Sequence, residues 1–167
     1  MKEVDKLSGI IGELRFKGPL QSKEVYENML DILARNQPNQ KWLLETEKMI
    51  LGKCEANQDQ QEILTKVTMK GKEVSLFCDG EVYNTRELKM ECENLGYCTS
   101  GNSDEELILQ GHLCFGERFL EKINGIFALV IYDGQYDSLF VACDRLGRIK
   151  CVFCLPQKSK GCLFMLK

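Results

Sequence analysis

Residues 74–106 read VSLFCDGEVYNTRELKMECENLGYCTSGNSDEE, and this stretch decides the fold. The apolar run Val74–Cys78 predicts a buried strand, and Asp79-Gly80 is a turn pair expected to end it. Asn84 begins a variant of the capping box, and Ser103–Glu106 is a second box of this kind, so each predicts a helix start. The middle of the chain is therefore expected to hold one strand followed by two helices.

Residues 123–147, INGIFALVIYDGQYDSLFVACDRLG, contain two further apolar runs. Ile126–Tyr132 and Ser138–Cys143 predict strands joined by a turn. The other expected elements are a strand at 8–14, an amphipathic helix at 23–35, a short helix at 119–123, and strands at 41–46, 48–54, 62–69, 150–155 and 162–166. Strands at both ends and helices in the middle predict an α+β fold, with packed antiparallel sheets and helices outside.

The 167-residue length suits a single domain with a substantial core. Hydrophobic residues make up 44% and charged residues 28%, which is typical of a soluble globular protein. The net charge of −3 gives no reason to expect nucleic acid or an anionic membrane as a partner. No apolar run approaches the roughly 20 residues that span a bilayer, and the N-terminus lacks the apolar core of a signal peptide. A cytoplasmic location is therefore expected.

Nine cysteines and one histidine are the residues to weigh for metal or redox chemistry. Without a secretion signal, thiols in a reducing compartment are a better interpretation than a disulfide framework. Cys151 and Cys154 form a C-x-x-C pair, but residues three apart on a strand point to opposite faces. His112 has no second histidine or nucleophile motif near it. Neither a metal site nor a cofactor is expected.

Four motifs resemble the glutaminase domain of asparagine synthetases, which is a class II glutamine amidotransferase with the N-terminal-nucleophile (Ntn) hydrolase fold. DGEVYN at 79–84 resembles the family's NGEIYN, and NSDEE at 102–106 resembles its SDTE. INGIFALVIYD at 123–133 resembles LNGMFAFAIWD, and CDRLG at 143–147 resembles RDRLG. One such motif would be weak evidence, whereas four in the right order are specific.

The resemblance covers nearly the whole chain and implies a four-layer αββα sandwich. It implies one domain over residues 1–167, in which residues 1–7 form an N-terminal extension. The chain ends where a glutaminase domain would end and contains no P-loop-like motif, so no synthetase domain is expected. In the DRLG turn, Asp144 and Arg145 are expected to form a structural pair.

The family's chemistry is hydrolysis of a primary amide through a thioester, which needs an activated nucleophile and donors for an oxyanion. Its nucleophile is a cysteine made N-terminal by loss of Met, in the sequence CGI, with the α-amine as base. Here SGI at 8–10 is the matching stretch, so Ser8 stands at the nucleophile position and seven residues precede it. A hydroxyl in mid-chain has no α-amine beside it, and Ser8 is therefore predicted to be inactive.

The substrate-binding motifs depart from the family as well. HRGPD resembles residues 35–39, RNQPN, and GHRRL resembles residues 52–56, GKCEA. The second match puts Glu55 where the family has the arginine that pairs with the α-carboxylate of glutamine. Reversing that charge turns attraction into repulsion. If the sequence match is shifted, Lys53 takes the place of the arginine. Lysine would bind the α-carboxylate as a single positive charge and lacks the two-pronged hydrogen bonding of arginine.

The oxyanion-hole motif is altered at one of its two donors. The family's asparagine is replaced by Asp79, and an ionised carboxylate can only accept hydrogen bonds. Gly80, whose backbone N–H is the second donor, is retained. Glu81 and Asp104 match the family's contacts to the substrate ammonium. As structural alternatives, Asp79 can be a turn residue and Asp104 can favour the start of a helix.

Three functional hypotheses follow. The first is an amidotransferase domain impaired or inactive as a glutaminase, acting as a binding, regulatory or partner module. The second is a glutaminase that becomes active when residues 1–7 are removed, with Ser8 as the N-terminal nucleophile. The third is a sensor of a small amine, held by Asp79, Glu81 and Asp104. The candidate partners are glutamine or an amine, a separate synthetase subunit, and a second copy of the chain.

Overall fold

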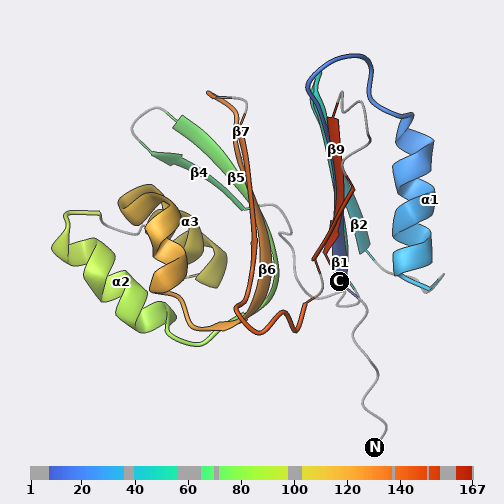
Figure 1. Cartoon of the computed structure of the whole chain (residues 1–167). Coiled ribbons are helices and arrows are strands. Elements are labelled where there is room, and N and C mark those ends of the chain that lie inside the picture. Colours follow the sequence, from blue (N-terminus) through green and yellow to red (C-terminus); the bar gives the residue numbers. More distant parts are fainter. Residues whose placement is uncertain are drawn as a thin grey trace, which may run out of the picture. The chain divides into compact units, whose positions relative to one another are not determined.

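A computed structural model describes residues 8–35, 40–55, 65–69, 72–97, 103–136, 138–149, 151–154 and 161–166 (Figure 1). The chain divides into two compact units. The first unit comprises residues 1–63 and 150–167, and the second comprises residues 64–149. Each unit is built on its own antiparallel sheet.

The sheet of the first unit has the strand order β2-β3-β1-β9-β8. Its strands are β1 (Gly9–Arg15), β2 (Gln40–Glu45), β3 (Met49–Glu55), β8 (Cys151–Cys154) and β9 (Gly161–Leu166). Helix α1 (Lys23–Leu33) covers one face of this sheet (Figure 1). Tyr26, Leu30 and Leu33 of α1 pack against Ile11 and Cys54, which gives the unit an apolar core.

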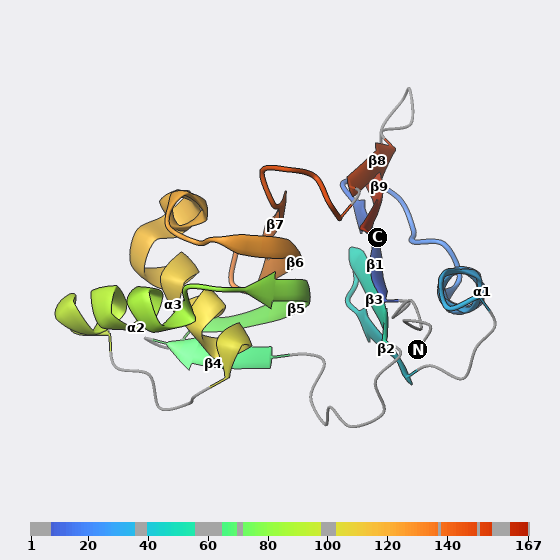
Figure 2. The same cartoon turned by 90° about the horizontal axis from the view of Figure 1, so that it is seen from below.

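The sheet of the second unit has the order β4-β5-β6-β7. Its strands are β4 (Thr65–Met69), β5 (Lys72–Val82), β6 (Gly125–Asp133) and β7 (Ser138–Cys143). Helices α2 (Thr85–Asn94) and α3 (Asp104–Phe115) and the 3-10 helix η1 (Gly116–Glu121) follow β5. Figures 1 and 2 show α2 and α3 side by side over one face of the sheet. Leu88, Ile108 and Phe119 bury their side chains against Leu76 and Leu129 of the strands.

Two antiparallel sheets with helices confirm the predicted α+β class. The strand predicted at 138–143 is confirmed with the same bounds, and the cap of α3 is confirmed by a 3.2 Å hydrogen bond from the Glu106 backbone N–H to Ser103 Oγ. The helix predicted at 23–35 ends at Leu33, and Arg35 follows with a positive φ of 50°. Residues 62–64 of a predicted strand, 36–39 of the RNQPN match and Asn102 lie outside the described residues.

The predicted turn at Asp79-Gly80 is wrong, because β5 runs through it to Val82. Asp79 lies opposite Ala128 and Gly80 lies opposite Phe127 in the pairing with β6. Gly80 has a φ of +106°, and a Cβ there would stand 2.0 Å from the carbonyl oxygen of Ile126. Glycine is therefore needed for β5 to stay in register with β6 at this point.

Candidate functional site

Ser8, at the nucleophile position, belongs to the first unit and directly precedes β1. Its side chain is half-buried. Strand β1 is antiparallel to β3, and Gly9 lies opposite Cys54. Ser8 and Glu55 therefore lie at the same end of this strand pair.

Lys53 and Glu55 form an ion pair on β3, with 3.0 Å between Lys53 Nζ and Glu55 Oε2. The two side chains are only 7% and 18% exposed, so the pair is largely removed from water. Cys54 contributes to the core under α1, and side chains alternate along a strand, so Lys53 and Glu55 project from the opposite face. The residue that the family match assigns to substrate recognition is thus bound to a lysine two positions earlier.

Asp79, Gly80 and Glu81 are consecutive residues of β5 in the second unit. Cys78 and Val82 contribute to the core under α2 and α3. By strand alternation, Asp79 and Glu81 project from the opposite face of the sheet. The structure therefore brings these two carboxylates to one face, and Gly80 stands between them.

Asp104 is the first residue of α3, in a helix turn that also holds Glu105 and Glu106. Acidic side chains in the first turn are favoured by the partial positive charge of a helix N-terminus. Asp104 and Glu81 are both exposed, and among the described residues neither forms a salt bridge. Both anions therefore stay open to solvent.

Asn84 has a role that the sequence did not predict. It occupies the N-cap position of α2 without making a side-chain cap hydrogen bond, so the predicted capping box is wrong there. Its side-chain amide donates to the Lys122 carbonyl oxygen and accepts from the Asn124 backbone N–H, both at 2.7 Å. The Tyr83 backbone N–H also donates to the Asn124 carbonyl oxygen at 2.7 Å. These bonds join the DGEVYN and INGIFALVIYD motifs.

The DRLG turn is stabilised by hydrogen bonds from backbone N–H groups to Asp144, and not by the predicted pair of Asp144 with Arg145. Asp144 is buried, and its Oδ1 accepts hydrogen bonds from the backbone N–H groups of Leu146, at 2.9 Å, and Arg148, at 3.5 Å. Arg145 is exposed. The backbone N–H of Asp144 in turn donates to the Phe127 carbonyl oxygen at 2.9 Å, which fixes the turn to β6.

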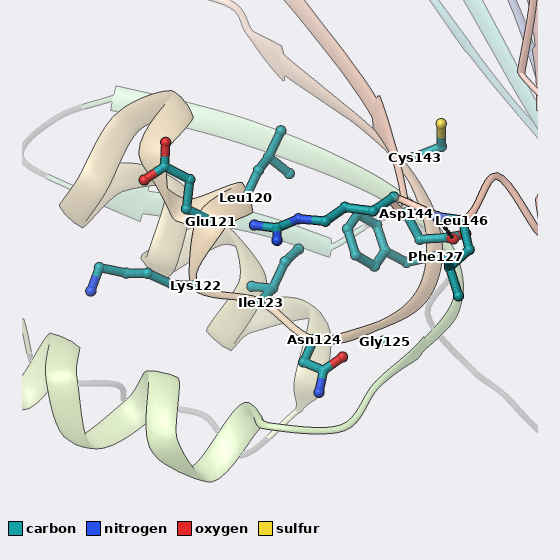
Figure 3. A pocket seen from close by; sticks show the side chains of 11 residues that line it. Leu120, Glu121, Lys122, Ile123, Asn124, Gly125, Phe127, Cys143, Asp144 and Leu146 are labelled. Carbon is teal, nitrogen blue, oxygen red and sulfur yellow. Dashed lines mark hydrogen bonds between the residues drawn. The ribbon is translucent and has the colours of Figure 1, made fainter.

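A cavity of about 530 Å³ opens beside this turn in the second unit (Figure 3). Its walls come from η1, the loop before β6, β6 itself, the end of β7 and the DRLG turn: Leu120, Glu121, Lys122, Ile123, Asn124, Gly125, Phe127, Cys143, Asp144, Arg145 and Leu146. None of the residues predicted for the amidotransferase site lines it. Lys122 forms a salt bridge with Glu91, so the cavity does not have the full charge of that lysine available for a ligand.

His112 packs as a core-edge residue. Its ring lies 5.5 Å from the ring centre of Phe119 and 5.0 Å from that of Phe140. Burial lowers the pKa of His112 below its ordinary value, and the charges of Asp133 and Glu117 offset part of this shift.

Among the described residues, no group of three or more His, Cys, Asp or Glu side chains could hold a metal ion. No helix in the described part of the chain is long and apolar enough to cross a membrane.

Two helix-covered antiparallel sheets, with the Asp-Gly-Glu motif on a central strand of the second, define an α+β fold of the Ntn-hydrolase type. A solved glutamine phosphoribosylpyrophosphate amidotransferase from B. subtilis, complexed with ADP and GMP, has this fold. It is similar over 94% of this chain and 41% of its own, with a TM-score of 0.66 and 15% sequence identity. The chain belongs to the glutamine amidotransferase domain family, which residues 7–165 match.

Curated relatives agree with this assignment. Asparagine synthetase [glutamine-hydrolyzing] 3 of Bacillus subtilis is 29% identical over 147 residues, which cover 84% of this chain and 24% of the relative. Asparagine synthetase B [glutamine-hydrolyzing] of Escherichia coli is 35% identical over 74 residues, or 44% of this chain and 13% of the relative. The chain thus spans about a quarter or less of the length of these relatives.

Proposed function

We propose that this amidotransferase domain does not hydrolyse glutamine and acts as a binding module, in partnership with a synthetase-type protein in the cytoplasm. The observation that carries the proposal is the Lys53–Glu55 ion pair. Glu55 stands at the position matched to the substrate-binding arginine. The ammonium of Lys53 beside it is already neutralised by Glu55. Because Lys53 is already paired with Glu55, neither side chain offers a free cation to a glutamine α-carboxylate.

Two further residues support the loss of hydrolysis. Ser8 is a hydroxyl within the chain, so it lacks the α-amine that would act as its base. Asp79 replaces an oxyanion donor by an acceptor, and removing one such donor costs roughly 100- to 1000-fold in rate. Each of these departures affects a different requirement of amide hydrolysis, so their effects on the rate combine.

The first test is ammonia release from glutamine by the purified full-length chain, with an intact mass measured on the same sample. We expect release at the level of buffer alone from a chain that retains residues 1–7. Ammonia released by that chain would refute the proposal. Release by a chain that begins at Ser8 would instead establish the processed glutaminase.

A gain-of-function series separates the three departures. The starting variant lacks residues 1–7 and carries Ser8→Cys after a removable initiator Met, and Asp79→Asn and Glu55→Arg are then added. We expect measurable glutaminase activity only when the substitutions are combined. Full activity from the Ser8→Cys chain alone would show that Glu55 and Asp79 do not impair the site.

A second candidate function is recognition of a small amine, because Glu81 and Asp104 are exposed carboxylates without a salt bridge among the described residues. Such a site would favour an ammonium group without an accompanying carboxylate. Thermal shifts with glutamine and with its α-carboxamide analogue test this idea, since a ligand of the native state raises the melting temperature. A shift with the carboxamide that Glu81→Gln abolishes would support amine recognition, and equal shifts with both compounds would refute it.

The partner proposal rests on the relatives, whose names describe glutamine-hydrolysing asparagine synthetases several times longer than this chain. A synthetase-type protein is therefore the proposed partner of this domain. Size-exclusion chromatography of the purified chain, alone and with a synthetase-type protein from the same genome, tests it. Co-elution with the synthetase is expected, and a peak at twice the chain mass in both runs would identify a second copy as the partner instead.

A further inference from the structure

Cys92 and Cys114 lie in contact between α2 and α3 in the second unit. Their thiol groups are hydrogen-bonded to each other. Cys92 is fully buried in the apolar core, whereas Cys114 packs at the edge of that core and is partly exposed. The two sulfur atoms thus differ in their access to solvent.

The packing of the two helices maintains this contact. A Cβ on Gly111 of α3 would stand 3.0 Å from Leu88 Cδ2 of α2, so the helices approach closely there. Leu88 precedes Cys92 by one helical turn, and Gly111 precedes Cys114 by three residues. Figures 1 and 2 both show α2 and α3 side by side. To form a disulfide, the two sulfur atoms must move from this hydrogen-bonded contact to the S–S bond length of about 2.05 Å.

We propose that Cys92 and Cys114 form a thiol pair that takes a hydroperoxide as its oxidant and closes to a disulfide. This modification site lies outside the amidotransferase motifs and does not depend on glutamine hydrolysis. A disulfide of this kind in a reducing compartment is transient and reports oxidation.

The two cysteines have different roles in this reaction. The Cys114 thiolate attacks one peroxide oxygen, the O–O bond breaks and hydroxide leaves, which gives a sulfenic acid at Cys114. The Cys92 thiol then loses its proton as its sulfur attacks Cys114 Sγ, the S–O bond breaks and water leaves. In total, two thiols and one hydrogen peroxide give one disulfide and two waters. This division matches redox sensors, in which an accessible cysteine stands next to a resolving one.

Burial supports this division of roles. It raises the pKa of the Cys92 thiol, which therefore stays protonated and is unsuited to attack a peroxide first. Cys114, at the solvent edge, is the cysteine that a hydroperoxide can reach. Cys92 reacts only after Cys114 has been activated as a sulfenic acid.

The disulfide would join α2 to α3 and enclose Ser103 and Asp104, the start of α3, within its loop. A cross-link reduces the conformational entropy of the unfolded chain, so the oxidised protein is expected to melt higher. A loop of this size corresponds to an increase of about 7–14 °C in melting temperature. Dithiothreitol should reverse the increase.

The test treats the full-length chain with hydrogen peroxide, blocks the remaining thiols under denaturing conditions and measures the intact mass. We expect two thiols to become protected and to return after dithiothreitol. Trypsin alone leaves Cys92, Cys98 and Cys114 in one peptide, residues 90–118, so chymotrypsin is needed to separate them. The digest should contain a Cys92 peptide linked to a Cys114 peptide.

Matched variants complete the test. Cys114→Ser and Cys92→Ala should each abolish the protected pair and the shift in melting temperature, whereas Cys98→Ser should retain both. Mapping in the wild-type chain keeps the test valid if a variant fails to fold. Alkylation of both Cys92 and Cys114 after peroxide, or a linkage from Cys98 to either of them, would overturn the proposal.

Discussion

The backbone N–H of Asn124 donates a 2.7 Å hydrogen bond to the side-chain oxygen of Asn84, 40 residues earlier in the chain. The same side chain donates to the Lys122 carbonyl oxygen, so one amide group fixes the start of α2 to the loop before β6. This loop also forms part of the wall of the cavity in the second unit.

Replacing Asn84 by Ala removes both bonds and is expected to lower the free energy of unfolding by about 1–2 kcal/mol. Asn84→Asp keeps the acceptor for Asn124 but loses the donor to Lys122, so its cost should be intermediate. Urea unfolding of the three proteins measures the differences. Wild-type stability in the alanine variant would show that water replaces these hydrogen bonds without loss.

Gly80 and Gly96 both have a positive φ, of +106° and +81°, but their surroundings differ. Gly80→Ala would place a Cβ 2.0 Å from the Ile126 carbonyl oxygen, and should lower the free energy of unfolding by more than about 3 kcal/mol or prevent folding. Gly96→Ala meets no atom within 4 Å and should cost only about 1 kcal/mol, the penalty for a left-handed backbone. Thermal melts compare the two, and equal losses would contradict the close approach of β5 and β6.

Local signals explain which parts of the fold could be predicted. The cap at Ser103 and the bounds of β7 depend on neighbouring residues, and the sequence indicated both correctly. The Asp79-Gly80 pair is also a local signal, but pairing with β6 overrides it. The role of Asn84 depends on residues about 40 positions away, which periodicity cannot identify.

In the candidate site, too, some features could be predicted from the sequence, whereas others depend on contacts between distant residues. The positions of Ser8, Glu55, Asp79 and Asp104 came from motif matches, and the structure describes each of them within its own unit. The ion pair of Lys53 with Glu55 could have been inferred, because residues two apart on a strand share a face. The contact of Cys92 with Cys114 could not, since it depends on how closely α2 approaches α3 at Gly111.

Glu55→Gln is expected to lower the free energy of unfolding by about 3 kcal/mol, because it leaves the buried ammonium of Lys53 without its anionic partner. Glu27→Gln is a matched control, since the Lys23–Glu27 pair spans 3.8 Å and its side chains are about half exposed. That variant should change stability by less than about 0.5 kcal/mol.

Replacing both Lys53 and Glu55 by apolar residues of similar size, Lys53→Met with Glu55→Leu, should recover most of the stability lost in Glu55→Gln. Urea unfolding at constant ionic strength provides the comparison. Equal, small effects of Glu55→Gln and Glu27→Gln would show that Lys53 reaches water and does not need Glu55.

His112 makes the stability of the protein depend on pH in a narrow window. Burial lowers the pKa of His112 in the folded state below its ordinary value of about 6.5. The unfolded chain therefore binds a proton that the folded chain excludes, and stability falls as the pH drops through about 6.5 towards the folded pKa. The chain has one histidine. In the His112→Phe variant, the free energy of unfolding should therefore fall less between pH 7.5 and about 5.5 than it does in the wild-type protein. Phenylalanine preserves the packing against Phe119 and Phe140, so stability at pH 7.5 serves as the internal control. An unchanged pH slope in this variant would mean that other groups titrate on unfolding in this window.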